Sequence, residues 1–99
     1  MVKVVDESPE EIARETRLSK LAVIAKDFLP HATSVHSWGG YYIMIHFDDT
    51  GQSKIDIYLN ENVMNVKSQR YLDYAVKLAE NYERLGEPEF TVKRRYPSS

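Results

Sequence analysis

Histidines are the residues of this chain best suited to chemistry, and His31, His36 and His46 lie close together in the sequence. A neutral imidazole serves as a general base near neutral pH and as a common metal ligand. His36 and His46 share one strand parity, but ten extended residues span about 33 Å, so the two rings meet only if the chain bends at Gly39-Gly40. The sequence has no HxH or HExxH spacing. We therefore predict no metal and no cofactor, and interpret these residues as surface histidines.

Other patterns that indicate catalysis are missing from the sequence. The chain has no cysteine, which excludes disulfides, thiolate nucleophiles and thiolate metal sites. It has no GxGxxG or Walker pattern, and Asp48-Asp49 is typical of a hairpin turn. The sequence does not decide whether the chain is an enzyme, but it favours a non-enzymatic protein. A small enzyme with His36 or His46 as general base, in a pocket completed by a dimer mate, is the weakest hypothesis.

Length and composition indicate one ordinary globular domain. The 99 residues, 42% hydrophobic and 28% charged, predict a single domain over 1–99, with disorder expected only at the ends, 1–7 and 97–99. The net charge of −2 disfavours tight binding to a long polyanion. Apolar stretches are shorter than the roughly 20 residues that span a bilayer, and the first residues do not resemble a signal peptide. We expect a cytoplasmic protein that does not associate with membranes.

Hydrophobic periodicity predicts two helices and at least three strands. Ser8-Pro9-Glu10-Glu11 has the pattern of a capping box, and Pro30 and Gly86 are helix terminators. The turn between the hairpin strands contains Gly51, which is free to take a positive φ angle. In chain order the predicted elements are a candidate strand Val2–Val5, a helix 9–29, hairpin strands 41–47 and 54–59, an irregular connection Val63–Val66, a helix 68–85 and a final strand 90–96.

These elements predict an α+β fold in which two helices pack on one face of a small antiparallel sheet. The order is (β)αββαβ, which is ferredoxin-like if Val2–Val5 joins the sheet and leaves a three-stranded sheet if it does not. Strand parity predicts the residues that pack against the helices. They are Tyr41, Ile43, Ile45, Phe47, Ile55, Ile57, Leu59, Phe90 and Val92.

The opposite parity assigns a second set of residues to a face that this chain does not cover. They are His36, Trp38, Tyr42, Met44, His46, Lys54, Asp56, Tyr58, Thr91, Lys93 and Arg95. A sheet face in contact only with water is usually polar, whereas this one carries the only tryptophan, two tyrosines and a methionine. Aromatic residues and methionine are enriched in interface cores. The simplest alternative is that these rings merely suit a strand and stay half-exposed.

The sequence therefore predicts a non-enzymatic protein-binding or regulatory module, of an accessory or inhibitor type, that self-associates or binds another protein through this face. The predicted binding residues are Trp38, Tyr42, Met44, Tyr58, His36, His46, Lys54, Lys93 and Arg95. The alternative is a platform for single-stranded nucleic acid, with the rings stacked on bases and the cations on phosphates. The acidic net charge disfavours that alternative.

Overall fold

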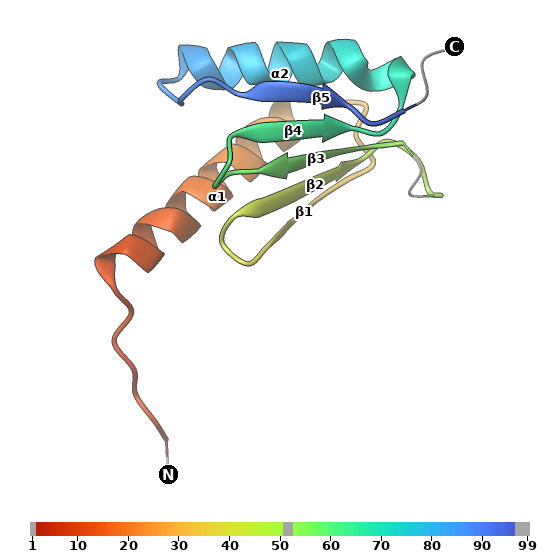
Figure 1. The fold of residues 1–99 in the computed structure, drawn as a ribbon. Helices are drawn as coiled ribbons and strands as arrows, with labels where there is room; N and C mark the ends of the chain where they lie inside the picture. Colours follow the sequence, from red (N-terminus) through yellow and green to blue (C-terminus); the bar gives the residue numbers. More distant parts are fainter. Residues whose placement is uncertain (1, 51–52, 97–99) are drawn as a thin grey trace.

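Two helices and five strands form the part of the chain that the computed structural model describes, residues 2–50 and 53–96 (Figure 1). The predicted α+β class, with two helices on one sheet face, is confirmed. The elements are α1 (Pro9–Phe28), β1 (Ser34–Trp38), β2 (Tyr42–His46), β3 (Lys54–Tyr58), β4 (Val63–Val66), a 3₁₀ turn η1 (Gln69–Tyr71), α2 (Leu72–Arg84) and β5 (Thr91–Arg94). The predictions for Gly51 and for the end 97–99 lie outside the described residues.

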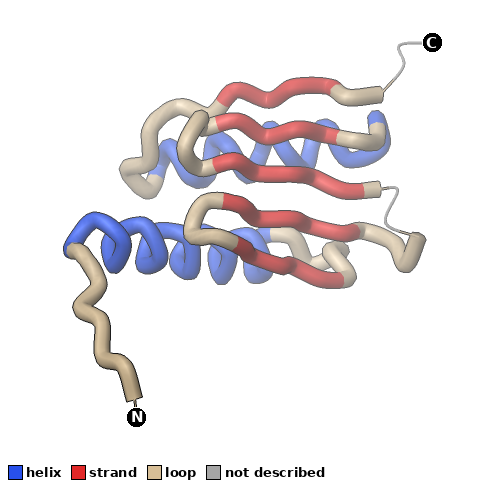
Figure 2. Tube along the Cα trace, turned by 60° about the horizontal axis from the view of Figure 1, so that its bottom comes forward, coloured by secondary structure: helices blue, strands red, loops and turns tan. Residues whose placement is uncertain are grey.

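The strands follow one another across the sheet in the order β1-β2-β3-β4-β5. The first three pairings are antiparallel, whereas β4 and β5 are parallel because α2 connects them and returns the chain to the same end of the sheet. The sheet is therefore mixed rather than purely antiparallel. In Figure 2 the strands lie in front of both helices, and α1 packs on β1 and β2 while α2 packs on β4 and β5.

Two strands were not predicted from the sequence. β1 separates from β2 because Gly39 and Gly40 take φ angles of +65° and +75°, which turns the chain back into a hairpin. β4 occupies Val63–Val66, which we predicted as an irregular connection, and it pairs with β3 after a turn in which Asn62 has a φ angle of 52°. A run of four residues is too short for its alternation to stand out in the sequence.

Residues Val2–Val5 form no strand, so the condition for a ferredoxin-like arrangement is not met. Val2 and Val4 are 88% and 86% exposed. The physical reason is the start of α1, where the Ser8 hydroxyl accepts the Glu11 N–H at 3.2 Å and the Glu11 carboxylate accepts the Ser8 N–H at 3.4 Å. This capping box, which the sequence predicts, starts the helix at Pro9 and directs the preceding residues away from the sheet (Figure 1).

The core lies between the sheet and the helices, and the predicted helix-packed residues fill most of it. Seven of the nine are buried: Ile43, Ile45, Phe47, Ile55, Ile57, Leu59 and Phe90. Val92 is half-buried, and the prediction for Tyr41 is wrong because that residue is 43% exposed. Tyr41 precedes β2, in the glycine turn, where its N–H bonds the Trp38 carbonyl at 3.3 Å and its ring lies across Gly39.

The two helices differ in how far they enter this core. The buried residues of α1 are Leu18, Leu21 and Ala25, from the middle of the helix onward, and its first turns project beyond the sheet (Figure 1). α2 buries a full stripe along its length, including Tyr82, whose hydroxyl donates to the Leu21 carbonyl at 2.6 Å and joins the two helices. Within the described residues, neither helix is long and apolar enough to cross a membrane.

Candidate functional site

The sheet face opposite the helices carries one row of aromatic residues across three adjacent strands. Trp38 of β1 is opposite Tyr42 of β2, and Tyr42 is opposite Tyr58 of β3. In the next row, His36 of β1 is opposite Met44 of β2. We call this side of the sheet the open face, and it bears all nine binding residues that the sequence predicts. They are His36, Trp38, Tyr42, Met44, His46, Lys54, Tyr58, Lys93 and Arg95.

Four rings of the open face stack on one another in a continuous series. The ring centroids are 5.4 Å apart between His36 and Trp38, 5.7 Å between Trp38 and Tyr42, and 4.9 Å between Tyr42 and Tyr58. The angles between the same ring planes are 23°, 28° and 8°. We call this series the aromatic ladder. Offset stacking of this kind stabilises each ring pair beyond its buried area, so the ladder is a preformed, rigid surface.

Stacking determines which parts of the rings remain available to a ligand. Tyr42 lies between Trp38 and Tyr58 and stacks with both, so it is the ring of the ladder that is flanked on two sides. Trp38 belongs to the edge strand β1 and stacks with Tyr42 of the next strand and with His36 of its own strand. Trp38 is 49% exposed, while Tyr42 and Tyr58 are half-buried. Trp38 is therefore the most exposed ring of the row Trp38, Tyr42 and Tyr58.

Asp56 lies beneath the ladder and is only 3% exposed, although it belongs to the open face. Its carboxylate accepts the Tyr42 hydroxyl at 2.7 Å, and the Lys67 ammonium lies 4.0 Å away. Burial, and then the hydrogen bond to Asp56, raise the pKa of Tyr42 well above its ordinary value. A buried carboxylate needs such partners. Asp56 thus fixes the position of the Tyr42 ring within the ladder.

Four cationic side chains lie on the open face, on the side away from Trp38. Lys54 is opposite His46, Lys67 follows β4, and Lys93 is opposite Asn65 on β5. Arg95 reaches the Asn65 side chain with an Nε–Oδ1 distance of 3.5 Å. Among the residues that the structure describes, Asp56 beside Lys67 is the only carboxylate within ion-pair distance of any of the four. The open face is therefore cationic in a chain whose net charge is −2.

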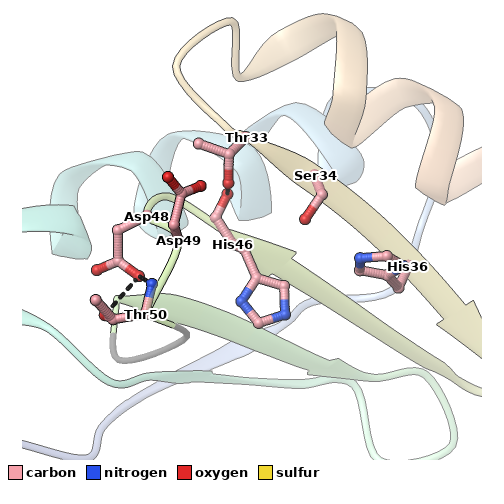
Figure 3. A pocket seen from close by; sticks show the side chains of 7 residues that line it. All are labelled: Thr33, Ser34, His36, His46, Asp48, Asp49 and Thr50. Carbon is pink, nitrogen blue, oxygen red and sulfur yellow. Dashed lines mark hydrogen bonds between the residues drawn. The ribbon is translucent and has the colours of Figure 1, made fainter.

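His36 and His46 meet at the end of the face near the β2–β3 loop. The glycine turn brings their strands together, so the bend that we set as the condition for their contact is present, and their ring centroids are 5.7 Å apart. They line an open depression of about 400 Å³ together with hydroxyl and carboxylate residues (Figure 3). Those further lining residues are Thr33, Ser34, Asp48, Asp49 and Thr50.

The depression does not combine its polar groups into a metal site. In the chain outside residues 1, 51–52 and 97–99, no three histidine or acidic side chains are placed to hold a metal ion. Asp48 accepts the N–H groups of Thr50 and Ser53 at 3.1 and 3.2 Å, which directs its carboxylate into its own loop. His31 lies elsewhere and packs edge-on against Tyr74 of α2, with a centroid distance of 6.1 Å. The three histidines thus divide into one contacting pair and one separate residue.

Sequence reasoning missed the contribution of β4 to the open face. Asn65 lies opposite Asp56, and Lys67 contacts the Asp56 carboxylate. The signal was present in Val63–Val66, where Met64 and Val66 alternate with half-buried Val63 and Asn65. Reading that alternation as a strand would have placed Asn65 and Lys67 beside the predicted residues.

Comparisons with protein-family models, with curated proteins and with solved structures gave no match to this chain.

Proposed function

We propose that this domain is a non-enzymatic protein-binding module, and that the open face is its contact surface. The aromatic ladder forms the centre of that contact. Tryptophan and tyrosine are prominent among the residues that carry binding energy at protein interfaces, and Trp38, Tyr42 and Tyr58 lie side by side on this face. Because the ladder is already stacked, little side-chain freedom is lost when a partner binds.

The observation that carries this proposal is the stacking of the rings on each other. Platforms for single-stranded nucleic acid hold bases by stacking them on free ring faces. Here Tyr42 lies between the stacked rings of Trp38 and Tyr58, and Tyr42 and Tyr58 are nearly parallel at 8°. The exposed indole of Trp38 and the Tyr58 hydroxyl remain for contact, and these groups suit the mixed apolar and polar surface of a protein.

Single-stranded nucleic acid is the second candidate ligand, and the cations of the open face favour it. Lys54, Lys93 and Arg95 would contact phosphates, as the sequence predicts. The occupied ring faces and the net charge of −2 weigh against this candidate. Self-association through the open face, which the sequence also predicts, has an electrostatic cost. A symmetric dimer joins the same patch of both copies, so the same cations would meet across its interface.

Selection of binders from a random peptide library on the immobilised domain tests the proposal. We expect selected peptides to lose at least about tenfold in affinity when Trp38→Ala removes the exposed indole, because truncation of a central tryptophan typically costs 2 kcal/mol or more, roughly thirtyfold. Leu85→Ala is the matched control, because Leu85 is 48% exposed against 49% for Trp38 but lines a groove between the helices. Anisotropy of labelled peptides measures both affinities.

The proposal fails if Trp38→Ala leaves the affinities unchanged while Leu85→Ala lowers them, because the contact surface would then be the helix side. It also fails if labelled single-stranded oligonucleotides bind the domain and no peptide does. Cooperative unfolding of both variants by urea confirms that each retains its fold.

A further inference from the structure

The aromatic and cationic parts of the open face lie at different places, and their separation indicates the chemistry of the partner. Tyr58 lies at the C-terminal end of β3 within the ladder, whereas Lys54 lies at the N-terminal end of the same strand. Four strand residues span about 13 Å. Lys67 lies beside Lys54, and Lys93 and Arg95 follow on the far edge of the sheet. The cations thus occupy the side of the face away from Trp38.

The one carboxylate that residues 2–50 and 53–96 place on the open face does not neutralise this group of cations. Asp56 is buried and already accepts the Tyr42 hydroxyl, and its closest cation is Lys67 at 4.0 Å. Lys93 and Arg95 are exposed, and Lys54 is half-buried. The acidic residues that make the chain negative overall include a cluster near its start, Asp6, Glu7, Glu10 and Glu11, at the projecting end of α1. This acidic cluster at the start of the chain is thus separate from the cations of the open face.

We infer that the partner of the open face is an acidic protein segment, with an apolar or aromatic side chain on the ladder and carboxylates over Lys54, Lys93 and Arg95. This inference rests on the proposed function and adds the charge of the partner to it. Complementary charges at the rim of an interface accelerate encounter and exclude partners of the wrong sign. Asp48 and Asp49 belong to the loop that precedes Lys54, so among the described residues the row of cations is free of acidic neighbours only toward β5, and most carboxylates of the segment lie on that side.

The same cations could bind phosphates, but the arrangement favours carboxylates on a protein. A bound single strand would place phosphates along the cations and bases on the ladder, but Tyr42 at the middle of the row is already flanked by the stacked rings of Trp38 and Tyr58. A protein segment needs only ring edges and a hydroxyl at that position. A second copy of this chain would bring its own four cations to the contact, which disfavours it as the occupant.

Three synthetic peptides of equal length and equal aromatic content, one acidic, one neutral and one basic, test the inference. The aromatic residue of each peptide is not tryptophan. The emission of Trp38, the only tryptophan of the chain, therefore reports contact with the ladder. We expect the acidic peptide to bind about tenfold or more tightly than the neutral one, and the basic peptide to bind more weakly still. Added salt should reduce this preference, since exposed ion pairs are screened.

A pair of charge-reversed variants locates the acidic contact. Lys54→Glu combined with Lys93→Glu should lower the affinity for the acidic peptide by about tenfold, equivalent to about 1.4 kcal/mol. Lys77→Glu combined with Lys20→Glu is the matched control, because it changes the net charge equally on exposed helix positions. We expect this control to have less than a twofold effect.

The outcomes separate the inference from the proposed function. If the neutral or basic peptide binds as tightly as the acidic one, or if the control variant weakens binding equally, the inference is overturned and the proposed function stands. If no peptide changes the Trp38 emission and an oligothymidylate does, both are overturned. If light scattering shows that the protein dimerises at micromolar concentration and Trp38→Ala abolishes the dimer, a second copy occupies the face and the acidic partner is overturned.

Discussion

The two faces of the same sheet have opposite chemistry, although their residues alternate along the same strands. On β2, Ile43 and Ile45 are fully buried under the helices, while Tyr42 and Met44 between them lie half-buried on the open face. On β3, Ile55 and Ile57 flank Asp56 in the same way. One face is aliphatic and covered by helices, and the other is aromatic, cationic and uncovered by the described part of the chain.

The difference shows two ways of excluding water from a sheet. The covered face relies on α1 and α2, which close over branched aliphatic side chains. The open face relies on its own side chains: Asp56 lies between Met44 and Asn65, contacts Tyr42 and Lys67, and is only 3% exposed without any helix above it. The ladder is thus a small structured layer in its own right. Changes on the covered face should therefore affect stability, and changes on the open face should affect binding.

The largest expected effect is on the covered face. Ile57→Ala leaves a cavity under the helices and should lower the free energy of unfolding by about 2–5 kcal/mol, because Ile57 is fully buried. Urea unfolding measures the loss. Val76→Ala, at an exposed position of α2, is the control and should change the same quantity by less than about 0.5 kcal/mol. Equal effects of the two variants would contradict the assignment of the core.

A smaller effect is expected from the buried carboxylate of the open face. Asp56→Ala removes the acceptor of the Tyr42 hydroxyl and should lower the free energy of unfolding by about 1–3 kcal/mol. Asp56→Asn keeps an acceptor for that hydroxyl and should cost less. Urea unfolding of the two variants, with Asp49→Ala as an exposed acidic control, gives the ranking. If Asp56→Ala is as stable as the unchanged protein, the ladder does not depend on this residue.

The smallest expected effect is on the pH dependence of the free energy of unfolding. It compares one tyrosine from each side of the sheet. Burial raises the pKa of Tyr82 above its ordinary value, and burial together with Asp56 does the same for Tyr42. A tyrosine in the unfolded chain loses its proton near pH 10, before either folded group does, so stability is full below that pH and is lost as the pH rises above it.

Tyr82→Phe and Tyr42→Phe should each reduce this alkaline loss of stability by a similar amount, because both folded groups keep their proton well above the pH at which the unfolded tyrosine loses it. The free energy of unfolding in urea, measured between pH 9 and 11, gives the slope for each protein. A slope that neither substitution changes would mean that other groups cause the loss.

The sequence predicts the fold where a pattern is long or chemically specific. The capping box at Ser8 and Glu11 and the hairpin of alternating residues in β2 and β3 are examples, and the structure confirms both. β4 was missed because its two buried residues, Met64 and Val66, are too few to define a period. The start of β2 was misjudged because two successive glycines with positive φ change the course of the chain in a way that composition does not specify.

For the candidate site, strand parity assigned all nine predicted residues to one face, because alternation depends only on local backbone geometry. The stacking of the rings, the burial of Asp56 and the presence of Lys67 depend on which strands are neighbours. That information comes from the register between strands, for example Tyr42 opposite Tyr58 and Asp56 opposite Asn65. Parity along a single strand does not contain it.

Because β5 pairs in parallel, after a crossover, the residues of the open face come from two separate parts of the chain. The strands β1 to β4 form a meander of short connections, so every ring of the ladder meets neighbours close in the sequence. Lys93 and Arg95 join the face only after the chain has crossed over through α2. Contacts between residues distant in the sequence carry a larger loop-closure cost. Detachment of β5 alone would thus remove two of the four positive charges and leave the rings in place, so that the face would keep its apolar contacts while its discrimination by charge would weaken.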